Sequence, residues 1–170
     1  MPARTKVCVI VVLMASTLSV SCSRGGGDNS PSAAMPPATG TSQGLTRSDM
    51  PAKCFLDSIG PASHPAFEKS VRVPADKPIV FAGWAIDEPN KAVASGLDIV
   101  IDNIPYGANY GSSRTDVAEH FQNPSYRNSG FQLTMATGQM PKGSHSVVIR
   151  VISQDRKAYY QSLPAVFTVE

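Results

Sequence analysis

Hydrophobic residues from about residue 53 onward recur in short runs separated by turn-forming residues, which is the pattern of a β protein. The pattern is clearest at residues 96–102, where Leu97, Ile99 and Ile101 alternate with two aspartates and would share one buried strand face. The expected strands are 53–59, 67–73, 79–86, 96–102, 131–135, 145–153 and 165–169, with an edge-like segment beginning at residue 105. This series predicts an all-β, antiparallel β-sandwich.

Two features refine the expected sheets. Residues 145–153 carry apolar side chains on both faces, which indicates a strand in the middle of a sheet. Asp102 and Asn103 close the alternating run, and both residue types tolerate the positive φ that tight turns need. We therefore expect a turn at these two positions.

One short helix is expected between the strands. Ser113 is positioned to accept a hydrogen bond from the backbone amide three residues later, and Asp116 near the helix start suits the helix dipole. Val117 and Phe121 are four residues apart and would share the buried face, and Pro124 helps to end the helix.

The first residues have the pattern of an export signal. Arg4 and Lys6 form a basic start, residues 7–18 are almost wholly apolar, and small residues follow. This arrangement is typical of a secretory signal peptide, which we assign to residues 1–21. The apolar run is well short of the roughly 20 residues that a membrane-spanning helix needs.

The next segment, residues 22–50, has a composition that does not support a core. It is rich in glycine, serine and proline, so it cannot bury enough apolar surface to offset the entropy of ordering it. We expect a flexible tether with a reach of roughly 30 Å, followed by a folded domain over residues 51–170.

Residues 18–22 (LSVSC) resemble the lipobox of bacterial lipoproteins. This resemblance implies that the signal is cleaved before Cys22, that the Cys22 thiol is diacylated, and that the lipid holds the protein in the cell envelope. Ser23 replaces the aspartate that often retains lipoproteins in the inner membrane, which favours the outer membrane of a diderm bacterium. The alternative is a plain secreted protein with an unmodified Cys22, since Ser19 and Ser21 also suit an ordinary signal peptidase.

A second resemblance covers nearly everything after the tether. Its residues are 83–87 (GWAID), 110–111 (YG), 114–118 (RTDVA), 129–131 (SGF) and 143–145 (GSH). They resemble a bacterial immunoglobulin-like module of exported and polysaccharide-related proteins. The resemblance implies an immunoglobulin-like sandwich in an envelope setting, and it carries no catalytic residues.

The parts of that motif also have structural interpretations. Trp84, the single tryptophan, is expected to be the largest side chain of the core, and Gly83 beside it allows a bulge or a close approach. Asp87 is expected to cap a turn. Arg114 and Asp116 form either a local salt bridge or a recognition pair at the helix.

Charge and cysteine content exclude several classes. The chain has 15 Lys and Arg against 13 Asp and Glu, and removal of the signal leaves 13 of each. No basic excess remains for a nucleic-acid partner. Cys54 is interpreted as a small core residue, with a free reactive thiol or an intermolecular bridge as alternatives. The three histidines lie on separate elements, so neither a metal site nor a cofactor is expected.

The remaining candidates for binding are polar aromatic residues and one ion pair. They are Tyr106, Tyr110, Tyr160, Arg114 and Asp116. We expect a non-enzymatic binding or assembly module that recognises an envelope glycan or a protein partner. An enzyme of polysaccharide processing whose site is not visible in the sequence is one alternative, and a purely structural spacer is another.

Overall fold

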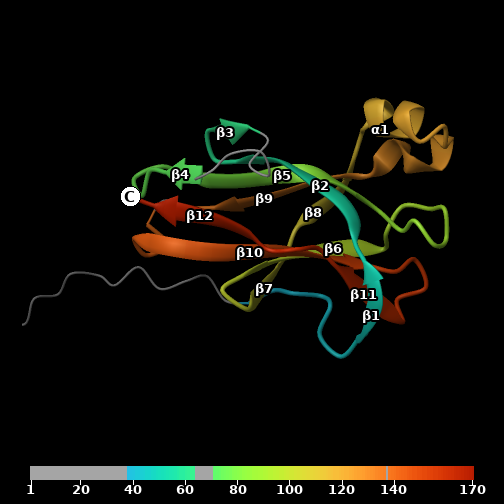
Figure 1. The fold of residues 1–170 in the computed structure, drawn as a ribbon, viewed down its shortest axis with the longest axis horizontal. Coiled ribbons are helices and arrows are strands. Elements are labelled where there is room, and N and C mark those ends of the chain that lie inside the picture. Colours follow the sequence, from blue (N-terminus) through green and yellow to red (C-terminus); the bar gives the residue numbers. More distant parts are fainter. Residues whose placement is uncertain (1–37, 64–70, 137) are drawn as a thin grey trace, which may run out of the picture. The chain divides into compact units, whose positions relative to one another are not determined.

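The computed structural model describes residues 38–63, 71–136 and 138–170, all within one unit of the chain, Ser32–Glu170. The expected signal peptide, Cys22 and the tether up to residue 37 lie outside the described residues. The described part consists of two β-sheets, one short α-helix and one 3-10 helix (Figure 1). The prediction of an all-β fold with a single short α-helix is confirmed.

The larger sheet, sheet A, is built around its longest strand, β10 (Gly143–Ile152). Along one side β10 pairs with β6 (Gly96–Ile101), which in turn pairs with β7 (Ile104–Gly107). Along the other side it pairs with two short strands, β11 (Ala158–Gln161) and β12 (Ala165–Val169). The expected central position of this strand is confirmed.

The edges of sheet A correct the expectation of a purely antiparallel sandwich. β1 (Thr46–Pro51) pairs with β11 in parallel, and β4 (Val71–Val73) pairs with β12 in parallel. Both are edge strands that arrive from distant parts of the sequence. Their direction is therefore not set by a hairpin, which forces neighbouring strands to be antiparallel.

Sheet B has five strands in the order β3-β2-β5-β9-β8. They are β3 (Ala62–Ser63), β2 (Lys53–Ile59), β5 (Ile79–Ile86), β9 (Gly130–Met135) and β8 (Asn109–Ser112). All pairings in this sheet are antiparallel.

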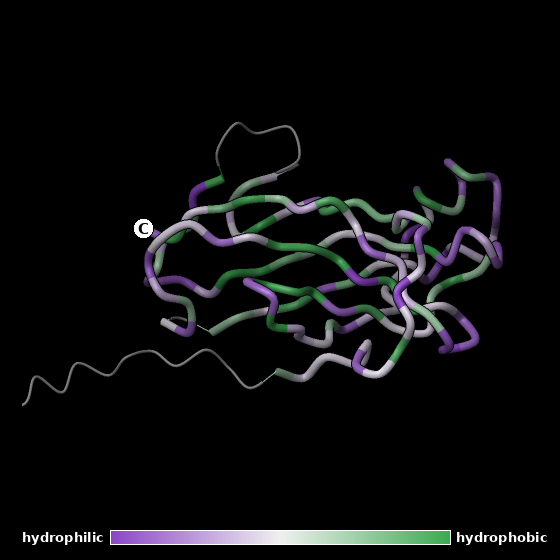
Figure 2. Tube along the Cα trace, turned by 60° about the horizontal axis from the view of Figure 1, so that its bottom comes forward, coloured by the Kyte–Doolittle hydropathy of each residue, from purple (hydrophilic) through white to green (hydrophobic). Residues whose placement is uncertain are grey.

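The core lies between the two sheets, and the hydrophobic stretches of the trace run along the strands (Figure 2). Leu97, Ile99 and Ile101 are buried as predicted, but Asp98 and Val100 on the other face of β6 are buried too, so the expectation of a half-buried strand is wrong. Phe81 of β5 meets Phe167 of β12 edge to face, with ring centroids 5.5 Å apart, so the sheets contact each other directly. The expected turn after β6 is also confirmed, because Asp102 and Asn103 both have positive φ.

The folded domain begins earlier than expected. The backbone amides of Thr39 and Gly40 donate to the Pro105 carbonyl of β7, and Thr41 and Ser42 bind the Asp98 carboxylate of β6. The chain then joins the opposite edge of the sheet as β1. Residues 39–51, the N-terminal strap, thus cross sheet A. Backbone and carboxylate hydrogen bonds hold this segment, which has few apolar side chains. The expected tether boundary at residue 50 is wrong.

The helical region also differs from the expectation in its caps. α1 spans Thr115–His120, and Arg114 occupies its N-cap position without a side-chain cap, so Ser113 does not have the predicted role. The helix ends before Pro124, which instead opens the 3-10 helix η2 (Pro124–Asn128). The Asn123 side chain accepts a hydrogen bond from the Ser125 amide and caps this second helix.

Candidate functional site

A cluster of aromatic side chains lies between α1, η2 and the outer face of sheet B. Its members are Trp84 of β5, His120 and Phe121 at the end of α1, and Tyr126 of η2. The Phe121 ring is the centre, since the other three rings contact it edge to face at 4.8–5.8 Å between centroids. This aromatic cluster is separate from the core between the sheets.

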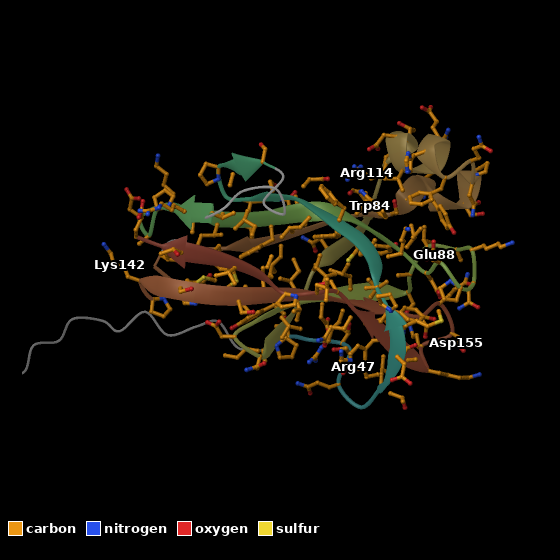
Figure 3. All side chains as sticks on the ribbon, viewed as in Figure 1. Arg47, Trp84, Glu88, Arg114, Lys142 and Asp155 are labelled. Carbon is orange, nitrogen blue, oxygen red and sulfur yellow. The ribbon has the colours of Figure 1, made fainter. Side chains whose placement is uncertain are left out.

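The position of Trp84 corrects the expectation that it anchors the core. Phe81, Gly83 and Ala85 of β5 are buried and face the other sheet, so Trp84 faces outward and is only half-buried. Figure 3 shows Trp84 and Arg114 close together beside the helical segment.

Arg114 connects the start of α1 to sheet B. Its Nε and NH2 atoms donate to the two Asp116 carboxylate oxygens at 2.9 and 2.7 Å, and its NH1 atom donates to Asp57 at 2.6 Å. The hydrogen bond from Arg114 lowers the pKa of Asp116 despite partial desolvation, and the same bonds raise the pKa of Arg114. The local salt bridge that the sequence allowed is therefore present, with Asp57 as a further partner.

A groove runs beside the aromatic cluster, between the helices and the β5–β6 connection. This helix groove has a volume of about 550 Å³ and is lined by Glu88, Lys91, Phe121, Gln122, Asn123 and Tyr126. The Asn123 amide donates to the Lys91 carbonyl and ties the two sides together. Lys53 lies 5.5 Å from the Phe121 ring centre and pairs with Glu88 at 3.6 Å.

The tyrosines expected to bind a ligand do not lie on this surface. Tyr106 and Tyr160 belong to sheet A and are only 2 % and 8 % exposed. Tyr110 lies on β8, where its hydroxyl donates to the Ala85 carbonyl and accepts from the Ala94 amide. Only Arg114 and Asp116 of the predicted set are brought together, and they border the helical region.

The other ionisable side chains that the sequence singled out take part in contacts within the fold. Asp87 accepts hydrogen bonds from both the amide and the side chain of Asn90, so its predicted turn cap is confirmed. Burial raises the pKa of the Cys54 thiol to about 12. His145 contacts the Asp102 carboxylate through Nδ1 and the Pro141 carbonyl through Nε2. Among the described residues, no group of three or more His, Cys, Asp and Glu could hold a metal ion.

Apart from Phe121, none of the groove residues could be identified as functional from the sequence. Glu88, Lys91, Gln122 and Asn123 come from two loops that are ordinary in composition. They meet because α1 and η2 fold back over the end of β5. Lys91 and Gln122 adopt positive φ without being glycines, a backbone conformation that their residue types do not indicate.

The sequence and the fold were compared with known proteins. No protein-family model and no curated protein matches the sequence. Among solved structures, an endo-beta-1,4-mannanase from Thermotoga petrophila aligns with 72 % of this chain at 10 % identity and a TM-score of 0.42. The aligned part spans 20 % of the mannanase chain, and no conclusion about this protein follows from it.

Within the described ranges, no helix is both long enough and apolar enough to cross a membrane.

Proposed function

We propose that this protein is a non-enzymatic, lipid-anchored binding module of the bacterial cell envelope, and that its helix groove holds an envelope glycan. The observation that carries the proposal is the half-buried aromatic cluster on the outer face of sheet B. This cluster is separate from the core between the sheets. A separate aromatic surface beside a groove of this size has the form of a ligand site.

The groove offers the two kinds of contact that a sugar needs. The Phe121 ring supplies an electron-rich surface for the C–H face of a sugar. Glu88 and Gln122 are exposed and supply a carboxylate acceptor and an amide that can both donate and accept. Lys53 pairs with Glu88, and Lys91 adds a further basic side chain to the lining of the groove.

The placement in the envelope is supported by the N-terminal residues. The signal-peptide pattern and the lipobox-like residues 18–22 support lipidation at Cys22. Two or three acyl chains give stable attachment, at about 0.8 kcal/mol per buried methylene. The two-sheet architecture and the GWAID-type motif together support the immunoglobulin-like class.

Binding to a glycan array of bacterial envelope oligosaccharides tests the groove. We expect the double variant Glu88→Ala/Gln122→Ala to lose most of the retention of the full-length protein in detergent micelles. The matched control is Asp49→Ala/Gln43→Ala, because both of these residues are exposed and belong to the strap.

Unchanged retention in the groove variant would rule out this site. If the protein bound envelope proteins and not glycans, the ligand class would be a protein partner. Turnover of an oligosaccharide on the array would favour the alternative of an enzyme.

A further inference from the structure

A second cavity lies where β6 begins and β10 ends, and it does not share lining residues with the helix groove. This sheet-end cavity has a volume of about 370 Å³, which is near the lower end of the roughly 300–1,000 Å³ of small-molecule sites. Its lining includes Thr41, Leu45, Ser95, Tyr110, Ile152 and Arg156. Its lining residues therefore come from the strap, from both sheets and from the β10–β11 turn.

The walls of the cavity are held in place before any ligand arrives. Tyr110 presents its ring, because its hydroxyl is engaged by the Ala85 carbonyl at 2.7 Å and the Ala94 amide at 3.0 Å. Burial raises the pKa of Tyr110 to about 12, so the ring stays uncharged. Thr41 is held by Asp98 through its amide at 2.9 Å and its hydroxyl at 3.0 Å.

Two polar side chains of the cavity lining have no hydrogen-bond partner among the described residues. The Ser95 hydroxyl is buried and has no hydrogen-bond partner. The Arg156 side chain makes no ion pair and no hydrogen bond with the part of the chain that the structure describes. Buried polar groups are nearly always satisfied, so an unpartnered hydroxyl in a cavity wall points to a ligand that satisfies it.

The surroundings narrow the chemistry of that ligand. Arg156 only donates hydrogen bonds, whereas the Ser95 hydroxyl can donate and accept, so the ligand must present acceptor oxygens to Arg156. An Asp98 carboxylate oxygen is only 3.9 Å from where a Cβ at the lining residue Gly107 would lie. This carboxylate opposes a negatively charged ligand. Leu45, Ile152 and the Tyr110 ring require an apolar face.

We propose that the sheet-end cavity binds one uncharged N-acetylated sugar residue. Its amide carbonyl and hydroxyl oxygens accept hydrogen bonds from Arg156 and Ser95, and its acetyl methyl and C–H face pack against Tyr110 and the aliphatic wall. This site is additional to the helix groove and does not depend on it.

An NMR titration of the full-length protein in detergent micelles tests the site, with N-acetylglucosamine and glucuronate as separate probes. We expect saturable shifts of the Gly96 and Gly107 amides with N-acetylglucosamine, at a dissociation constant on the order of 1–10 mM. Glucuronate should bind more weakly. Arg156→Gln and Ser95→Ala should each weaken binding about fivefold or more, whereas Arg47→Gln, which changes an exposed arginine on β1, should bind as the wild type.

Ser95→Ala separates a binding role from a structural one. Because it removes a buried hydroxyl without a partner, the thermal midpoint should stay the same or rise while affinity falls. No saturable shift, tighter binding of glucuronate, or wild-type affinity in either variant would overturn the proposal. Shifts confined to residues 121–123 would also overturn it, but they would support the proposed function of the helix groove.

Discussion

Gly83 shows how a single position in the core controls the packing of both neighbouring strands. A Cβ at this residue would lie 2.1 Å from the Phe55 carbonyl oxygen and 2.8 Å from the Phe131 ring. β2 has a register irregularity directly opposite, between Leu56 and Ser58. The close approach and the bulge expected from the sequence are both present.

We expect Gly83→Ala to lower the free energy of unfolding by about 1–3 kcal/mol, because the backbone carbonyl and the ring must move. Gly96→Ala is the matched control in a strand, since its nearest neighbour would be 3.6 Å away, which is an ordinary contact. Urea unfolding of both variants measures the difference. Equal stability of the two variants would contradict the packing explanation.

Asp102 provides a residue-scale prediction about pH. Burial acts to raise its pKa, but hydrogen bonds from His145 and the Ser146 amide, with the charge of His145, hold the pKa below 3.8. A carboxyl group with a lowered folded-state pKa adds stability above the unfolded pKa and loses it as pH falls through the folded pKa.

The stability difference between the wild type and Asp102→Asn should therefore be constant above about pH 5 and shrink below pH 3.8. Urea unfolding of both proteins from pH 2 to pH 6 measures this difference. A difference that does not change with pH would show that the ionised form of Asp102 is not favoured by folding.

At the scale of elements, the N-terminal strap depends on one side chain. Asp98 is 0 % exposed and accepts hydrogen bonds from the amides of Thr41 and Ser42 and from the Thr41 hydroxyl. The strap has few apolar residues, so these bonds and the pairing of β1 with β11 hold it against the sheet. β1, which forms the end of the strap, is almost wholly exposed.

Asp98→Ala should release the strap, because two backbone amides at a mostly buried site lose their acceptor, at a cost of about 2–4 kcal/mol. Limited trypsin digestion should then cut after Arg47, which in the wild type pairs with Tyr159. Asp49→Ala, an exposed aspartate of the same strand, should be cut as slowly as the wild type. Equal cutting of both variants would contradict the role of Asp98.

The whole molecule is proposed to be held at a membrane through its first residue after cleavage. Cys22→Ala should prevent acylation and processing, and the protein should move from the detergent phase to the aqueous phase in detergent partitioning. The reason is that the folded domain presents mostly polar strands and loops at its surface. Identical partitioning of wild type and variant would rule out lipidation at Cys22.

The strap also changes the geometry of the proposed attachment. Because the chain is bonded to the domain from residue 39 onward, the proposed tether after Cys22 would end before residue 39 and not at residue 50. The polar composition of residues 39–50 could not reveal this, since the bonds that hold them involve backbone amides and a distant aspartate.

The sequence by itself determined the features that depend on neighbouring residues. The bounds of β2, β5 and β12, the positive φ of Asp102 and Asn103 and the central position of β10 follow from alternation, turn chemistry and a strand apolar on both faces. Tertiary structure alone decided the features that depend on distant residues. It turned Trp84 outward, buried Asp98 under the strap and placed Tyr110 in a cavity wall. Alternation records that two sides of a strand differ, but only the packing of the other elements decides what covers each side.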